Sequence, residues 1–474
     1  MPVDREAIRE NAKYLRNVRP IDPDEITEYV PQNPDPRAIR QVLRESAWDL
    51  DIVERKDGTF VPVSDDSLTM VHRPVERLPP KYADVLEDLL VEEWGPNWFR
   101  GTSGDTIRKG IRRMKEDYLH QNSVEYDREG ALAYAIYHLA DYYATGWYVV
   151  QELGIEGLLD SRLSILDVGA GVGGPMLGIH DRVFDTSESR DVPPLVKYTA
   201  VEPSEASTLL DALGRQTNDN FHLEIVDSRA ESFEPDDTYD LVVFFNVLSE
   251  LEDPVAVANE YLQYLEADGT MVLLSPADRN TSLLLRDVER SLESQAGATV
   301  YGPTVRLWDD DRPTDECWSF VTRPDLETPA FQERLGGETA DPEEIRNVDV
   351  QYSYSFLRRD DTSRYDVSLS TDAVAKMGEM DRHVSNRIVV IGVKLSNDLG
   401  SDDHAVFKIS DGSESLAHFA VLVNETGLNR ELIDAEYGDL LRFDGVLALY
   451  NEDESAYNLV VDEETIVDSV GGLA

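Results

Sequence analysis

A short apolar strand that ends in an acid and runs directly into a glycine-rich loop most constrains how this chain can fold. Residues 164–168 (Ser-Ile-Leu-Asp-Val) form the strand, residues 169–174 (Gly-Ala-Gly-Val-Gly-Gly) form the loop, and a helix is expected from Pro175. Glycine lets the backbone turn sharply and approach a ligand closely at the carboxyl edge of a parallel sheet. This order of strand, loop and helix predicts a cofactor site in an α/β fold.

Two kinds of cofactor site share this glycine pattern. Gly169, Gly171 and Gly174 also satisfy the spacing of dinucleotide-binding loops. A dinucleotide site presents bare backbone amides and a helix N-terminus to a pyrophosphate, which the carboxylate of Asp167 would repel. The same carboxylate can accept a hydrogen bond from the ammonium of a methionyl group. The acid therefore favours S-adenosylmethionine (SAM) as the cofactor over a nicotinamide dinucleotide.

Further strands repeat the pattern downstream, and two of them end at an acid. Glu202 follows the second strand, where its carboxylate can accept from both ribose hydroxyls, and Asp227 follows the third, within reach of the adenine amino group. Alternating strands and helices from 164 to 359 predict a doubly wound, parallel α/β sheet. Its second to fifth strands are expected at 197–201, 222–226, 240–245 and 269–274. The predicted cofactor residues are Asp167, Gly169, Gly171, Gly173, Glu202 and Asp227.

Acidic residues dominate the composition. The chain has 94 Asp and Glu against 44 Lys and Arg, and its net charge of −50 is spread over all 474 residues. With only 9 Lys beside 35 Arg, the composition resembles that of proteins from salt-accumulating halophiles. At molar salt the Debye length is about 3 Å, so charge repulsion is screened. The net charge therefore does not exclude nucleic-acid binding, which depends on local basic patches.

Length and hydropathy predict several globular domains. Hydrophobic residues make up 41% of the chain, enough for packed cores, and no apolar run reaches the roughly 18 residues that a membrane span needs. Residues 1–16 are charged throughout and lack the apolar stretch of a secretory signal. We therefore expect a soluble, cytoplasmic protein without membrane association.

The N-terminal part has the pattern of a helix followed by a hairpin. A helix is expected at 36–47, and strands are expected at 51–55 and 59–63 around a Lys-Asp-Gly turn. This order matches the end of a winged helix, although a helix and a hairpin also occur together without nucleic-acid contact. The expected segments are 1–65 (winged-helix-like), 66–130 (helical), 131–365 (the α/β domain) and 385–474 (a β-barrel).

The C-terminal segment has the pattern of an OB-fold, a small five-stranded barrel. A short helix at 429–437 is expected between its third and fourth strands, as in that fold. Lys394, Lys408 and Phe443 are among the side chains that can contact RNA or, as we expect for most of them, fill the barrel. The five strands are expected at 387–395, 405–410, 416–423, 439–450 and 456–461.

Two adjacent helices carry the other candidates for RNA contact. Arg108, Lys109, Arg112 and Arg113 lie in a basic stretch of an otherwise acidic chain, where they can hold phosphates or pair with acidic neighbours. Both interpretations remain open. The tyrosines of the next helix, between 134 and 148, are expected to pack in the core and not to stack on bases.

Several motifs resemble one particular family. These are Asp-Leu-Val-Val-Phe-Phe-Asn-Val-Leu-Ser-Glu-Leu at 240–251, Leu-Ser-Pro at 274–276 and Tyr-Ser-Tyr-Ser-Phe-Leu-Arg at 352–358. Over residues 118–360 the chain resembles class I SAM-dependent methyltransferases, and within them the methyltransferase-like assembly factors of the small ribosomal subunit, known from mitochondria with bacterial and archaeal relatives. The resemblance implies SAM as cofactor, and the small ribosomal subunit and its rRNA as partners.

The chain departs from this family in two ways. Members carry several cysteines that ligate an iron–sulfur cluster, but here Cys317 is the only cysteine, so we expect no metal centre. No Asn-Pro-Pro-Tyr loop and no Pro-Cys nucleophile is present. Asn246 and Glu250 are nearest to the expected methyl-acceptor face and are the candidate catalytic residues. Two hypotheses follow: an rRNA methyltransferase, or a non-catalytic, RNA-binding assembly factor that uses the same fold.

Overall fold

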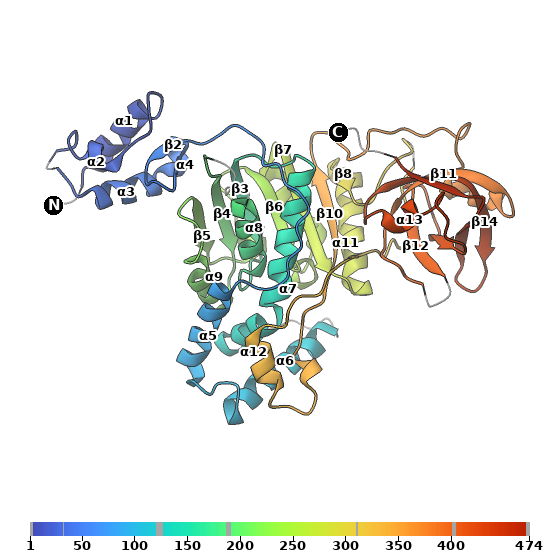
Figure 1. The fold of residues 1–474 in the computed structure, drawn as a ribbon, viewed down its shortest axis with the longest axis horizontal. Coiled ribbons are helices and arrows are strands. Elements are labelled where there is room, and N and C mark those ends of the chain that lie inside the picture. The colour runs from blue at the N-terminus through green and yellow to red at the C-terminus, as the bar shows by residue number, and fades with distance from the viewer. Residues whose placement is uncertain are drawn as a thin grey trace. The chain divides into compact units, whose positions relative to one another are not determined.

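The computed structural model describes residues 3–31, 33–119, 127–185, 191–309, 311–400 and 404–470 (Figure 1). The chain divides into two compact units. Unit 1 comprises residues 1–242 and 324–350, and unit 2 comprises residues 243–323 and 351–474. No helix within the described ranges is long and apolar enough to cross a membrane.

Unit 1 begins with a small module of helices and a hairpin. The expected hairpin is present, and Ile21 pairs with Phe60 to add a third strand position. Asp4 and Asp35 cap the first and third helices by accepting from the backbone N–H groups of Ala7 and Arg37. The elements are α1 (Arg5–Leu15), α2 (Pro23–Ile26), α3 (Pro36–Glu45), α4 (Ala47–Leu50), β1 (Ile52–Glu54) and β2 (Phe60–Pro62). Their order is compatible with a winged helix, which stays a prediction.

The hairpin is tied to the α/β part of unit 1. Asn220 exchanges two hydrogen bonds with the backbone of Glu54, at 2.8 and 2.9 Å. The Arg162 guanidinium lies 3.6 Å from the ring centre of Trp48 in α4. One edge of the expected wing is therefore occupied by contacts within the protein.

Three helices precede the sheet: α5 (Pro80–Trp94), α6 (Gly101–Leu119) and α7 (Arg128–Ile155). Helix α7 packs along α8 (Gly174–Asp185), and glycines allow the close approach. A Cβ atom at Gly178 would lie 1.9 Å from the Tyr143 carbonyl oxygen, and one at Gly146 would lie 2.2 Å from that of Pro175. Only glycine fits at these two crossings.

The sheet of unit 1 has the parallel strands that the sequence predicts. They are β3 (Arg162–Val168), β4 (Leu195–Val201) and β5 (Phe221–Val226), with α9 (Ala206–Gly214) between the last two. The strand order is β5-β4-β3, followed by β6 (Tyr239–Phe245). The carboxyl ends of the three parallel strands therefore reach one edge.

The boundary between the two units lies within β6, where unit 2 begins. The strand order in unit 2 is β6-β7-β10-β8, with β9 paired to β10. Strand β10 is antiparallel to β7 and β8, with Leu357 opposite Met271 and Phe356 opposite Gly302. The expected all-parallel sheet is therefore wrong at this end, and the sheet is mixed. The remaining elements before the barrel are α10 (Pro254–Tyr261), β7 (Leu265–Pro276), α11 (Arg279–Ser291), β8 (Thr299–Gly302), β9 (Val321–Arg323) and β10 (Val350–Arg358), with α12 (Ala330–Gly336) in unit 1.

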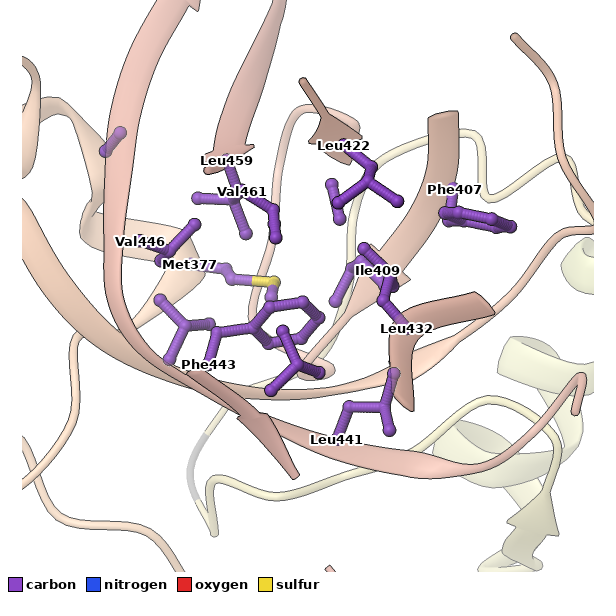
Figure 2. Close-up of a cluster of buried hydrophobic side chains, with 14 of the residues drawn as sticks. Met377, Phe407, Ile409, Leu422, Leu432, Leu441, Phe443, Val446, Leu459 and Val461 are labelled. Atoms are coloured by element: carbon purple, nitrogen blue, oxygen red, sulfur yellow. The ribbon is translucent and has the colours of Figure 1, made fainter. Parts of the chain in front are cut away.

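The C-terminal part of unit 2 is a closed five-stranded barrel, as expected for an OB-like fold. The order β11-β12-β13-β15-β14 closes through pairing of β14 with β11, and β13 pairs with β15 in parallel. Its apolar interior includes Met377, Phe407 and Phe443 (Figure 2). The elements are β11 (Arg387–Lys394), β12 (Ala405–Ser410), β13 (His418–Leu422), α13 (Glu431–Asp434), β14 (Leu440–Asn451) and β15 (Ala456–Val461). A sixth strand, β16 (Ile466–Ser469), pairs with β14 and was not predicted.

Candidate cofactor site

Asp167 lies near the end of β3 and is completely buried. Its Oδ2 atom accepts a 2.7 Å hydrogen bond from the Tyr198 hydroxyl, whereas Oδ1 has no partner among the described residues. Burial raises the pKa of Asp167 to about 7, the charge of Glu202 adds to the rise, and the Tyr198 hydrogen bond opposes it. The carboxyl group thus keeps one buried acceptor atom for a donor that the described residues do not supply.

The glycine loop turns beside this carboxyl group. Gly169, Gly171 and Gly173 all have φ between 54° and 85°, a region that favours glycine. The Gly171 N–H donates to Glu202 Oε2 at 2.9 Å. A Cβ atom at Gly171 would meet nothing within 4 Å. The loop therefore borders open space, and glycine keeps that space clear.

Glu202 and Asp227 lie at the ends of neighbouring strands. Glu202 is buried, and its Oε1 atom accepts from the Ser204 N–H at 2.9 Å, so backbone donors hold both carboxylate oxygens in place. Val201 pairs with Val226, which brings Asp227 to the same sheet edge one position later, where it is exposed. The structure thus brings Gly171 and Glu202 into one hydrogen-bonded group beside Asp167, with Asp227 at the next strand end.

This group of residues fits SAM. The buried Oδ1 atom of Asp167, which lacks a partner among the described residues, suits an ammonium donor, and the fixed carboxylate of Glu202 suits vicinal hydroxyls. The cleared space at Gly171 allows a ligand to approach the backbone. A pyrophosphate would instead meet two buried carboxyl groups, so the donor set also disfavours a dinucleotide.

Tyr198 is a site residue that the sequence analysis missed. The strand register contains the signal: Asp167 pairs with Ala200, so Tyr198 lies two positions before that partner and on the same face of the sheet. Its hydroxyl therefore reaches the carboxyl group diagonally. The signal becomes visible only once β3 and β4 are aligned.

The two catalytic candidates belong to unit 2. Asn246 follows β6 with φ of +59°, donates its N–H to the Leu274 carbonyl at 3.0 Å, and has a buried side-chain oxygen without a partner among the described residues. Glu250 ends a short 3-10 turn and is exposed. An asparagine that combines a left-handed backbone conformation with an unsatisfied side-chain oxygen is uncommon and is often found at functional sites. The catalytic role of Asn246 and of Glu250 stays a prediction.

The basic stretch is only partly available to RNA. Arg108 is buried and donates to the carbonyls of Phe99 and Leu335 and to Asp105. These contacts occupy its guanidinium from a buried position and disfavour a phosphate partner, so RNA contact by Arg108 stays a prediction that the geometry does not support. The distant Leu335 partner explains why the sequence did not reveal this.

The other three members of the stretch are exposed. Arg112 donates to both carboxylate oxygens of Glu344, at 2.5 and 2.7 Å, whereas Arg113 lies 3.6 Å from Asp117. Lys109 and Arg113 border a cavity of about 250 Å³ between α6 and the start of α7. Acid pairing, the alternative interpretation, therefore holds for Arg112, and RNA contact by Lys109 and Arg113 stays a prediction.

Polar residues of the barrel serve its structure. Lys394 is buried and donates to the carbonyls of Leu432 and Ala435. Lys408 is also buried, and its Nζ atom lies 3.2 Å from Asp315 Oδ2. Cys317, which precedes the barrel, is buried as well, and burial raises the pKa of its thiol. This fits a small core residue. The two lysines therefore serve the interior of the barrel, in agreement with the expectation that most of its candidate side chains fill the fold.

Comparison with known proteins places these features in context. A family model for a methyltransferase domain matches residues 146–332. Models for the N-terminal and C-terminal domains of a family of unknown function, DUF8157, match residues 5–56 and 378–470. No curated protein matches the chain.

Three solved structures illustrate the similarity. A protein of Listeria monocytogenes named as a class I SAM-dependent methyltransferase is 11% identical, with 62% of this chain and 90% of that chain covered and a TM-score of 0.33. The plantazolicin methyltransferase BpumL, solved with S-adenosylhomocysteine, is 13% identical, with coverages of 59% and 99% and a TM-score of 0.27. A protein of Thermoplasma acidophilum named as a methyltransferase is 13% identical, with coverages of 43% and 71% and a TM-score of 0.28.

The methyltransferase match includes the glycine loop and both strand-end acids. Together with the strand orders of the two units, it shows a Rossmann-like methyltransferase fold with a mixed sheet. The match agrees with SAM as the cofactor that the sequence predicts.

Proposed function

We propose that this chain is a SAM-dependent methyltransferase whose acceptor lies in the rRNA of the small ribosomal subunit or its precursor. The observation that carries the methyltransferase part is the buried Asp167, whose Oδ1 atom has no partner among the described residues and which precedes the cleared loop at Gly171 on the chain. The ribosomal part is supported by the resemblance of residues 240–251 to small-subunit assembly factors.

The residues of the site bind and orient. SAM, when bound, supplies a methyl group activated on a sulfonium. Asp167 accepts from the amino group of the ligand, and Glu202 accepts from its hydroxyls while backbone N–H groups fix the carboxylate. Methyl transfer from a sulfonium proceeds largely through alignment of donor and acceptor, so holding the ligand firmly contributes directly to the rate.

RNA contact is supported by two separate regions. The closed barrel has OB-like strand order, and barrels of this kind bind single-stranded nucleic acids in many proteins. Lys109 and Arg113 are exposed on α6 beside a cavity. Guanidinium and ammonium groups bind phosphates through charge-assisted hydrogen bonds, which remain effective where salt screens long-range attraction.

A deletion strain tests the proposal. Mass spectrometry of small-subunit rRNA is expected to show one methylated nucleotide missing in the deletion strain. Wild-type protein should restore it, and the near-isosteric variant Asp167→Asn, which cannot accept as an anion, should not. The matched control is Asp236→Asn, which removes the same charge from an exposed residue before β6, at the opposite edge of the sheet, and should restore the methyl group fully.

The alternative function is a non-catalytic assembly factor. The sequence favours it in one respect, because neither of the two familiar catalytic signatures of RNA methyltransferases is present. In that case the deletion strain would accumulate immature small subunits, every rRNA methyl group would remain, and Asp167→Asn would restore assembly. This result would overturn the enzymatic proposal.

A further inference from the structure

Three side chains form a ladder of rings along one face of α7. Tyr134, His138 and Tyr142 are spaced four residues apart, and the His138 ring lies 4.9 Å from the first ring and 4.6 Å from the second, nearly parallel to the latter. The side chain of His138 is 21% exposed. The ladder therefore places a partly accessible imidazole between two phenol rings.

This ladder adjoins the glycine loop. A Cβ atom at Gly174 would lie 2.9 Å from Tyr142 Cβ and 3.4 Å from the Leu139 carbonyl oxygen. Near the start of α8, Gly174 lies against Tyr142, and towards the end of α8, Arg182 donates to Gln151, which comes later in α7. Helices α7 and α8 therefore run in the same direction. The turn of α7 before Tyr142 therefore extends past the loop at the carboxyl edge of β3, and His138 lies on that turn.

A buried carboxyl group orients the imidazole. His138 Nδ1 lies 3.2 Å from Asp141 Oδ2, and Asp141 is 8% exposed. Asn347 is next to the pair, with its amide nitrogen 3.3 Å from the same Nδ1 and 3.0 Å from the Tyr137 carbonyl oxygen. An ionised Asp141 carboxylate only accepts, so this contact places a ring hydrogen on Nδ1 and leaves the lone pair on Nε2, while the Asn347 amide, also a donor, is satisfied by the Tyr137 carbonyl oxygen.

Burial raises the pKa of Asp141, and the attraction of His138 opposes that rise. The carboxylate is thus most stable beside a protonated imidazole. This is the arrangement of a base that is held in one tautomer and stabilised once it has taken up a proton.

We infer that His138, oriented by Asp141, is the general base of the methyl transfer, which takes the proton from an N–H or O–H acceptor of an RNA nucleoside. The inference rests on the proposed function. In the step, the acceptor atom forms a bond to the methyl carbon, the carbon–sulfur bond breaks, and its electron pair stays on sulfur. The proton of the acceptor passes to Nε2 of His138, so a neutral thioether and an imidazolium result. Tyr134 and Tyr142, which the sequence pattern assigns to the core, are only half-buried, so their rings provide flat surfaces against which a base can stack.

The first test measures whether the cofactor covers His138. Diethyl pyrocarbonate acylates accessible neutral imidazoles, and mass spectrometry of peptides gives the rate for each histidine. We expect S-adenosylhomocysteine at about ten times its dissociation constant to slow modification of His138 about tenfold. His72, which is exposed, is the internal control and should react at an unchanged rate. Unchanged modification of His138, while calorimetry shows the ligand bound, would overturn the inference.

The second test measures turnover with small ribosomal subunits from cells lacking the protein and radiolabelled SAM. His138→Gln should lower kcat by about 100-fold or more, with the KM for SAM unchanged, and Asp141→Asn should cause a smaller loss. His72→Gln is the matched control and should behave as wild type. Full activity of His138→Gln would overturn the inference while leaving the proposed function intact. Absence of both ligand binding and methyl transfer in the wild type would instead overturn the proposed function.

Discussion

At the residue scale, Asp167 combines two properties that link cofactor binding to pH. Its carboxyl group is buried, with a pKa of about 7, and one of its oxygens has no partner among the described residues. A cationic amino group at that oxygen favours the ionised form, so the pKa falls when SAM binds. The affinity for SAM should therefore rise as the pH rises through about 7.

The consequence is a proton released on binding. Below about pH 7 the free site holds a proton on Asp167 that the complex does not, so calorimetry at about pH 6 in two buffers of different ionisation enthalpy should give different heats. Asp167→Asn should bind more weakly and show no buffer dependence. Equal heats in both buffers for the wild type would contradict this role.

Gly171 offers a second test at the same scale. Gly171 and Gly157 both have positive φ and open space at the Cβ position, so Val costs similar backbone strain at either residue. Thermal unfolding of Gly171→Val and Gly157→Val should therefore show comparable losses of stability. Only Gly171→Val should lose SAM binding in calorimetry, because its side chain fills the space beside the loop. Equal SAM affinities of the two variants would place the ligand elsewhere.

The sequence predicted the site residues that strand ends determine. Asp167, Glu202 and Asp227 follow from where apolar strands stop, since parallel strands bring their carboxyl ends to one edge. Tyr198 and His138 depend on strand register and on the packing of α7 against α8, which no local pattern encodes. Contacts of this kind can be identified only in the folded structure.

At the element scale, α6 carries two kinds of basic side chain, one buried and structural and the others exposed. Arg108 donates to two backbone carbonyls and to Asp105 from a buried position, so Arg108→Ser leaves buried acceptors unsatisfied. We expect a loss of about 2–4 kcal/mol in the free energy of unfolding by chemical denaturation. A stability equal to wild type would show that these hydrogen bonds contribute little.

The exposed residues Lys109 and Arg113 on the same helix should affect RNA association and not stability. Lys109→Ser combined with Arg113→Ser should leave the free energy of unfolding within about 0.5 kcal/mol of wild type. If these residues hold phosphates, co-sedimentation of the double variant with small-subunit precursors should fall while SAM binding stays unchanged. Co-sedimentation at wild-type levels would mean that this face of α6 is only solvated.

Element type was predictable, but strand direction was not. Apolar periodicity gave the strands of the barrel and of β3 to β7 within a few residues. The antiparallel course of β10 depends on the long connection after β8, and a strand pattern reads the same in both directions. The burial of Arg108 likewise depends on Leu335, which is far away in the sequence.

At the scale of the whole molecule, the acidic excess should make stability depend on salt. The net charge is −50, and many of the ion pairs that offset it are exposed, such as Arg5 with Glu45 and Arg37 with Asp35. Self-repulsion between the excess acids opposes the folded state, and exposed pairs contribute little to its stability. Salt that screens the repulsion should therefore stabilise the protein.

Screening predicts the shape of this dependence. The Debye length falls from about 10 Å at 0.1 M to about 3 Å at 1 M, so most of the rise in Tm should occur below about 1 M KCl. Sorbitol at matched osmolality is the control, since it is excluded from protein surfaces without screening charge. A Tm that rises equally in sorbitol, or that stays constant between about 0.1 and 1 M KCl, would contradict electrostatic repulsion as the cause. A steep rise confined to KCl would mean that screening of charge repulsion stabilises the fold of this acidic chain, as its composition predicts.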